Sequence, residues 1–304
     1  MKLTYVAANV CTNHFLMAYK TRRGSGFLFY LVLSLLASGG SPCCGQVPEM
    51  NAHKLVDQAM QAQVAAENDS SRFEYLQQQL EKHDARTYRI VESDAGDVQR
   101  LVAINEEDLT PLQSAHENHL LDKLLADPSI QQKRQKEDAD EKARRQKIIV
   151  VLGQAFLYDI EATEAGGQII RLHFRPNPKF HPTSREAKVC AGLEGTMWID
   201  QQKGRFVRAD GTLVRDVDFG WGLFGHLDKG GHFAIEQTEV GPGVWRITSL
   251  DVSFKGSMLI FKSLNIKVRE HSFSFQSVPD HFSLEDAVEM LRHDSSRTST
   301  PPKE

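Results

Sequence analysis

The sequence has little cysteine and no excess of charge of either sign. Four cysteines in 304 residues exclude a scaffold built on disulfides, because such scaffolds are short and rich in cysteine. The 36 Lys and Arg residues are balanced by 40 Asp and Glu residues, so the sequence predicts no nucleic-acid partner. With 40% hydrophobic residues, the chain can form one large domain or two small ones.

Recognisable catalytic motifs are also missing. The chain contains no G-x-S-x-G elbow, no phosphate-binding loop with Lys and Ser/Thr, no C-x-x-C pair and no EF-hand loop. Its 12 histidines and many carboxylates would allow any triad to be imagined, so none is assigned. We therefore expect a protein that is not an enzyme, with no catalytic residues, no bound metal and no cofactor.

Two short motifs resemble sites but lack the context that a site needs. Gly220 to Gly225 matches G-x-G-x-x-G, but no helix is predicted after it to receive a pyrophosphate, so we expect bends of a sheet. His116 and His119 are three residues apart, whereas the zinc motif places its histidines four apart. Cys190 is expected to be a small buried hydrophobe.

The N-terminal residues 1–45 are predicted to be a signal peptide. Basic residues within 20–23 precede the apolar run Phe27–Leu36, and small residues follow at 37–39. The run is shorter than the roughly 20 residues that span a bilayer, although a retained anchor is the alternative. A start at Met17 would give an ordinary basic region. We therefore expect export to the periplasm or to the periplasmic face of the outer membrane.

Two adjacent cysteines after this run raise the question of a lipid anchor. A bacterial lipidation signal has a small residue directly before the cysteine, whereas Cys43 follows Pro42 and Cys44 follows another cysteine. Lipidation is therefore not favoured on sequence alone.

The segment 46–110 is predicted to hold an N-terminal helix and the first strands. Apolar residues recur at helical spacing over 51–67, and alternation predicts strands at 87–92 and 100–104. Residues 72–82 fit either a helix or a strand.

The segment 111–150 is predicted to be a charged helical insertion. Thr110 followed by Pro111 is typical of a helix start, and Asp127-Pro128 ends that helix. Residues 131–147 mix charges of both signs at close spacing, which indicates a solvated helical face. This segment is a candidate surface for a partner protein of the envelope.

The segment 151–280 is predicted to be an antiparallel sheet. Thr183 and Glu186 have the spacing of a capping box before a short helix. Turns are expected at 203–204, 210–211, 241–243 and 255–256. The strands are expected at 155–160, 168–174, 196–200, 205–209, 212–219, 232–240, 244–254, 257–268 and 271–276. Residues 281–304 are expected to form a short helix and a disordered tail.

One predicted strand, 257–268, is apolar on both faces in places, so its sheet is expected to cover a helix or an apolar ligand. Residues of one parity, together with two residues of the preceding strand, are therefore candidates to line a ligand cavity. These candidates are Trp245, Ile247, Met258, Ile260, Leu264 and Ile266. Lys262 shares their parity and is expected at the rim or on the surface.

The stretches GTMWIDQQKGRFVRADGTL (195–213) and GLFGHLDKGGHFAIEQTEVGPGVWRITSLDVSFKGSMLIFKSLNIKV (222–268) resemble bacterial envelope proteins of the lipoprotein-sorting (LolA/LolB/RseB-like) family, and most closely secreted relatives of those carriers. The resemblance implies an α+β fold: a strongly curved antiparallel sheet, or unclosed β-barrel, with helices on its concave face. The segment 111–150 is an insertion that the compact carriers lack.

Two functions follow from this resemblance. The first is a non-enzymatic envelope protein that binds a lipid, an acyl chain or a lipoprotein in the concavity of the sheet. The alternative is a structural or sensory interaction module of the envelope that holds no ligand and docks a partner through 111–150.

Overall fold

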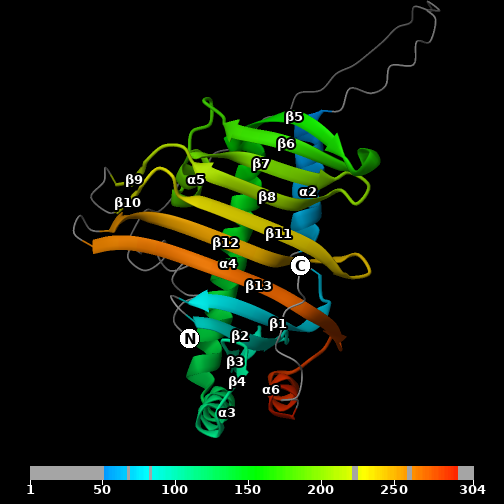
Figure 1. The fold of residues 1–304 in the computed structure, drawn as a ribbon, viewed down its shortest axis with the longest axis vertical. Helices are drawn as coiled ribbons and strands as arrows, with labels where there is room; N and C mark the ends of the chain where they lie inside the picture. Colours follow the sequence, from blue (N-terminus) through cyan, green and yellow to red (C-terminus); the bar gives the residue numbers. More distant parts are fainter. Residues whose placement is uncertain (1–50, 67–68, 82–83, 221–224, 259–261, 294–304) are drawn as a thin grey trace, which may run out of the picture.

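The computed structural model describes residues 51–66, 69–81, 84–220, 225–258 and 262–293. The predicted signal peptide and the tail from 294 lie outside these residues. The described chain is an α+β structure with one large antiparallel sheet of 13 strands and five helices (Figure 1). The described edge strands, β4 (Glu107–Asp108) and β5 (Phe156–Glu164), do not pair with each other, so the sheet is not closed.

The sheet brings together strands from both ends of the chain. Its main path runs β4-β3-β2-β1-β13-β12-β11-β8-β7-β6-β5; the short strand β10 pairs with β12, and β9 pairs with β10. Arg72 of β1 pairs with Val278 of β13, so the first strand docks on the last. The strands not yet located are β1 (Arg72–Glu81), β2 (Asp84–Val91), β3 (Val98–Ile104), β6 (Ile169–Pro176), β7 (Leu193–Asp200), β8 (Arg205–Leu213), β9 (Val217–Phe219), β10 (Gly225–Leu227), β11 (His232–Gly241), β12 (Val244–Met258) and β13 (Lys262–Val278).

The helices begin where local capping predicts. Thr110 caps α3 (Pro111–Ala126) in a capping box with Gln113, and Asp127 caps α4 (Pro128–Ala155). The predicted helix 51–67 is confirmed as α2 (Ala52–Ala66), and 281–304 holds α6 (Leu284–His293).

Helix α4 connects the two edges of the sheet. The chain leaves the sheet after β4 and returns at β5, on the opposite edge. The 28 residues of α4 extend about 42 Å at 1.5 Å per residue. The ten strand spacings between these edges add up to about 48 Å at 4.8 Å each. Figure 1 shows α4 passing behind the strands from one end of the sheet toward the other.

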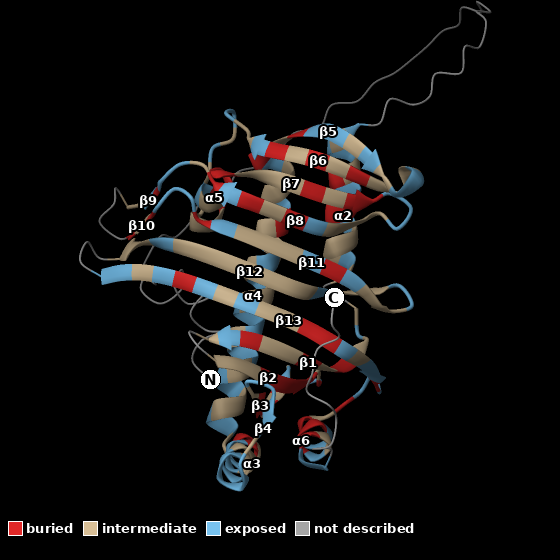
Figure 2. Ribbon diagram, viewed as in Figure 1, coloured by how far each residue is buried: buried red, intermediate tan, exposed pale blue. Residues whose placement is uncertain are grey.

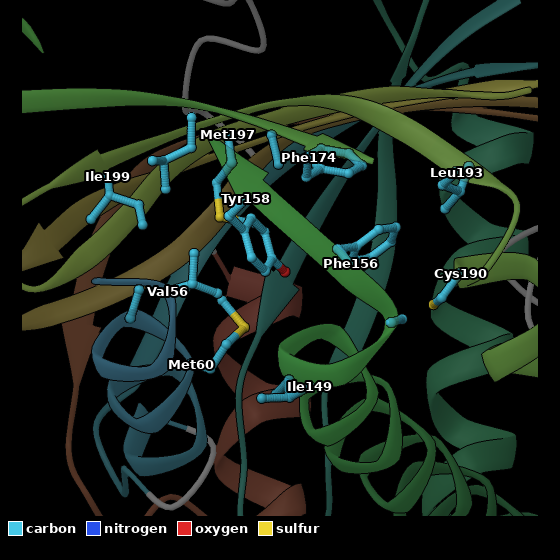
Figure 3. Close-up of a cluster of buried hydrophobic side chains, with 14 of the residues drawn as sticks. Val56, Met60, Ile149, Phe156, Tyr158, Phe174, Cys190, Leu193, Met197 and Ile199 are labelled. Atoms are coloured by element: carbon cyan, nitrogen blue, oxygen red, sulfur yellow. The ribbon is translucent and has the colours of Figure 1, made fainter. Parts of the chain in front are cut away.

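Apolar side chains form a large core at one end of the sheet and a smaller one at the other. Val56 and Met60 of α2 and Ile149 of α4 pack on the face of β5 to β8 (Figure 3). At the other end, Leu121 of α3 and Val288 of α6 pack against β2 and β3. Figure 2 shows buried residues concentrated at these two ends, and mostly intermediate or exposed residues on β11 to β13 between them.

Two glycines that we expected to make turns lie inside strands instead. The predicted turn at 210–211 is wrong, because β8 runs unbroken to Leu213. A Cβ on Gly211 would lie 2.8 Å from the Phe233 ring, and one on Gly256 would lie 1.9 Å from the His226 carbonyl oxygen. Both glycines therefore allow close approach of a neighbouring group rather than a turn.

Three further boundaries differ from the prediction. The strand expected at 257–268 is wrong, because β12 ends at Met258 and β13 begins at Lys262, and these two residues pair. The short helix α5 (Arg185–Cys190) is capped by Ser184, whose hydroxyl accepts from the Ala187 amide, and not by Thr183. Helix α4 continues to Ala155, because its last turns carry apolar residues into the large core.

Candidate functional site

The central strands present an apolar surface on the same face as the large core. Residues directly opposite each other in an antiparallel pair share a face. Ile235 of β11 pairs with Leu250 of β12, and Val252 of β12 pairs with Val268 of β13. These four residues, which we call the apolar panel, share a face with Phe254, which packs against the large core.

The apolar panel is not packed into any core cluster of the described residues. All four side chains are partly exposed, and β12 contains no buried residue along its 15 positions. By contrast, Ile170 and Leu172 on β6 and Ile199 on β7, farther along the same sheet, are completely buried. Apolar surface left in contact with water at the middle of a sheet is a feature of binding sites.

The middle of α4 supplies polar rather than apolar groups. Arg134, Glu137, Glu141 and Arg144 are partly buried and recur at spacings of three and four, which places them on one face of the helix. Ile149 and Ala155 belong to the large core, but no residue of α4 before Ile149 is buried. The Arg134 guanidinium donates to the carbonyl oxygen of Asp97, in the β2–β3 turn. Helix α4 is therefore attached at this turn and at the large core, with a charged stretch between.

Polar side chains border the panel on the side of β1. Glu270 pairs with Leu250 on one side and with Gln79 on the other. Gln77 donates to the Ser272 hydroxyl at 3.2 Å, and Gln79 donates to the Gln77 side-chain oxygen at 2.6 Å. The face thus changes from aliphatic to hydrogen-bonding between β13 and β1.

The structure brings some of the predicted ligand residues onto this face. Leu264 packs against the large core, and Ile266, which is buried, pairs with Phe254. Met258 ends β12 and pairs with the exposed Lys262. The even-numbered residues keep a common face across the hairpin because an odd number of residues, 259–261, joins the strands.

The other predicted ligand residues lie elsewhere. Trp245 and Ile247 lie near the far end of β12, where Ile247 is 43% exposed. Ile260 lies outside the described residues. The panel residues Ile235, Leu250 and Val252 were not identified from sequence, although the alternation of Leu250, Val252 and Phe254 carried the signal.

The other candidate sites considered from sequence lie away from the panel or are described only in part. His116 and His119 are exposed on α3, and the described residues contain no cluster of His, Cys, Asp or Glu that could hold a metal. Gly225 opens the short strand β10, which pairs with β9, and residues 221–224 between them lie outside the described residues. Cys190 is buried as expected, and burial raises the pKa of its thiol to about 12.

One histidine outside the panel lies between carboxylates. His226 Nδ1 lies 2.7 Å from Asp218 Oδ1, and its Nε2 lies 3.3 Å from Asp228 Oδ1. The hydrogen bond with Asp218 raises the pKa of His226. These groups form a local ion-pair network on the β9–β10 hairpin.

None of the described helices is both long and apolar enough to span a bilayer.

Comparison of the chain with protein-family models, with curated proteins and with solved structures gave no match.

Proposed function

We propose that this protein binds the apolar chain of an amphiphile on the apolar panel, between α4 and strands β11 to β13. The observation that carries the proposal is the partial exposure of Ile235, Leu250, Val252 and Val268 in the middle of a 13-stranded sheet. Central strands of a large sheet are ordinarily covered, and uncovered aliphatic rows favour binding of an apolar group.

An alkyl chain suits this surface better than a flat protein partner. Helix α4 passes behind the same strands and is attached at both ends of that passage, at the β2–β3 turn and at the large core (Figure 1). A partner protein would have to displace α4 to reach the panel. A single alkyl chain is only about as thick as one layer of side chains, so it needs far less room. The panel offers aliphatic side chains, and the middle of α4, which passes behind the same strands, carries charged ones, which matches the two parts of an amphiphile.

The finer points of this proposal concern shape and location. In it, the sheet is strongly curved, an unclosed barrel, with α2 and α4 on its concave face, as the likeness to lipoprotein-sorting envelope proteins implies. In it, residues 1–45 are a signal peptide that directs export, and the protein acts in the periplasm or at the outer membrane. Its ligand is the acyl chain of a lipid or of a lipoprotein. These points stay predictions of the sequence.

A neutral long-chain alcohol, dodecanol, tests the proposal without any contribution from charge. We expect the full chain to bind dodecanol in calorimetry, and Val252→Asn to weaken binding at least tenfold. The matched control is Ser253→Asn, on the adjacent residue that faces the other side of β12. Binding that is absent from the wild-type chain, or equally reduced in both variants, would contradict the proposal.

A second function, docking of an envelope protein through 111–150, is favoured by exposed apolar side chains on the two helices. Leu112 of α3 is 82% exposed and Val150 of α4 is 64% exposed. Since the end of α4 belongs to the large core, deletion of the helix would damage the fold. The variant Leu112→Ser with Val150→Ser tests docking instead: capture of a partner from envelope extracts should be lost while the melting temperature is kept.

A further inference from the structure

Glu270 differs from the other carboxylates of the central strands. Glu236 and Asp251 lie on the opposite face and form ion pairs with Arg208 and Arg269. Glu270 lies on the face of the panel, directly opposite Leu250 and two residues from Val268. Among the described residues, no side chain forms a hydrogen bond or an ion pair with its carboxylate.

The surroundings of Glu270 disfavour a bare negative charge. Its side chain is only partly exposed, and this burial raises the pKa of its carboxyl. Gln79, opposite it on β1, is buried and donates to Gln77. A carboxylate placed at the end of an aliphatic surface without a partner is stabilised by a ligand that brings a hydrogen-bond donor or a positive charge.

The cations of the same region are already engaged or distant. Arg134 of α4 donates to the Asp97 carbonyl oxygen, and Arg144 lies 2.8 Å from Glu141. Lys262 shares the face of Glu270 but precedes it by eight residues, which is about 27 Å along a strand. Arg86, opposite Gln79 on β2, lies 3.4 Å from Glu81. The charge available to a ligand at this border of the panel is therefore negative.

We propose that the ligand is a cationic amphiphile whose ammonium group binds the Glu270 carboxylate while its alkyl chain lies on the apolar panel. This inference rests on the proposed function, because it assigns the polar end of the same ligand. It predicts discrimination against amphiphiles that end in a carboxylate or a phosphate, since a second negative charge beside Glu270 is repelled.

Three amphiphiles with the same alkyl chain separate the two proposals. Dodecylammonium, dodecanol and dodecanoate are titrated into the full wild-type chain near pH 7, at concentrations at which each is dissolved as a monomer. We expect dodecylammonium to bind about tenfold more tightly than dodecanol, and dodecanoate to bind more weakly than either. In Glu270→Gln, the advantage of dodecylammonium should disappear while dodecanol binds as before.

The control variant is Glu236→Gln, on the opposite face of β11, which should keep the wild-type order. Equal binding of dodecanol and dodecylammonium, preference for dodecanoate, or a preference that persists in Glu270→Gln would overturn the inference while leaving the proposed function intact. Failure of all three amphiphiles to bind would overturn the proposed function, and with it this inference. Unfolding midpoints of both variants confirm that they are folded.

Discussion

The end of the sheet at β5 to β8 and its centre at β11 to β13 differ in burial although one row of side chains crosses both. Five residues on five adjacent strands form this row, each lying directly opposite the next, so that all share one face: Leu172, Met197, Ala209, Ile235 and Leu250. The first three are buried, and the last two are partly exposed. Burial therefore changes along the row without any change in the apolar character of the strands.

The difference comes from what covers the row. Helix α2 and the end of α4 place Val56, Met60 and Ile149 over the first strands (Figure 3). The middle of α4, which passes behind the central strands, carries Arg134, Glu137 and Glu141 and no buried residue (Figure 1). An alternating strand indicates which face can be buried, but the sequence of the covering helix decides whether it is buried.

Ion pairs also differ in burial between an end of the sheet, here β1 to β3, and its centre. This difference gives the largest expected effect on stability. Glu74 and Arg89, at the β1 to β3 end, form a pair whose side chains are almost fully buried. Glu74→Gln removes the negative charge from this buried pair, and we expect a loss of about 3–5 kcal/mol in the free energy of unfolding. Urea denaturation followed by circular dichroism measures this loss.

The matched control is Asp251→Asn in the exposed pair with Arg269, 2.9 Å apart on the central strands. Exposed pairs contribute about 1 kcal/mol or less. Similar losses in the two variants would contradict the expectation that burial sets the contribution of an ion pair to stability in this sheet.

The second effect compares two leucines of the same row. Leu172 is fully buried, so Leu172→Ala should cost about 2–5 kcal/mol through lost burial and a residual cavity. Leu250 is partly exposed, so Leu250→Ala should cost about 1 kcal/mol or less in the ligand-free protein. Denaturant midpoints of the two purified variants give this comparison, and an equal cost would show that the panel is packed.

The smallest effect concerns His226 on the hairpin beside β12. Its pKa is raised in the folded state, mainly by the hydrogen bond with Asp218. The stabilisation is therefore complete below the unfolded pKa, about 6.5, and is lost as pH rises through the higher folded pKa. We expect a change below about 1 kcal/mol because the site is partly solvated. Melting temperatures across this pH range should fall in the wild type, and this fall should be absent from Asp218→Asn.

Local sequence signals were sufficient to predict the elements whose ends are determined by residues close by in the chain. The start of α3 follows from the Thr110 side chain and Pro111, and both are within one turn of the helix. The ambiguous segment 72–82 became β1 because it lies between β2 and β13, and the latter strand is almost 200 residues away. No local pattern contains that partner.

Distant contacts also explain the errors at glycine. Gly211 and Gly256 were interpreted as turn residues, but their role is to let Phe233 and the His226 backbone approach. The same limitation applied to the candidate site. Parity placed Leu264 and Ile266 on one face, which is the face of the panel in the structure. The partial exposure of Ile235 and Leu250, by contrast, depends on which residues of other elements cover them.

The pairing of β1 with β13 affects the order in which the chain can fold. Strands β1 to β4 gain their permanent neighbour only when residues up to Val278 are available. During synthesis these strands have an open hydrogen-bonding edge, and contacts of such long sequence separation form slowly. The sheet can therefore be completed only after nearly all of the described chain has been made, whereas β5 to β8 have their partners much earlier.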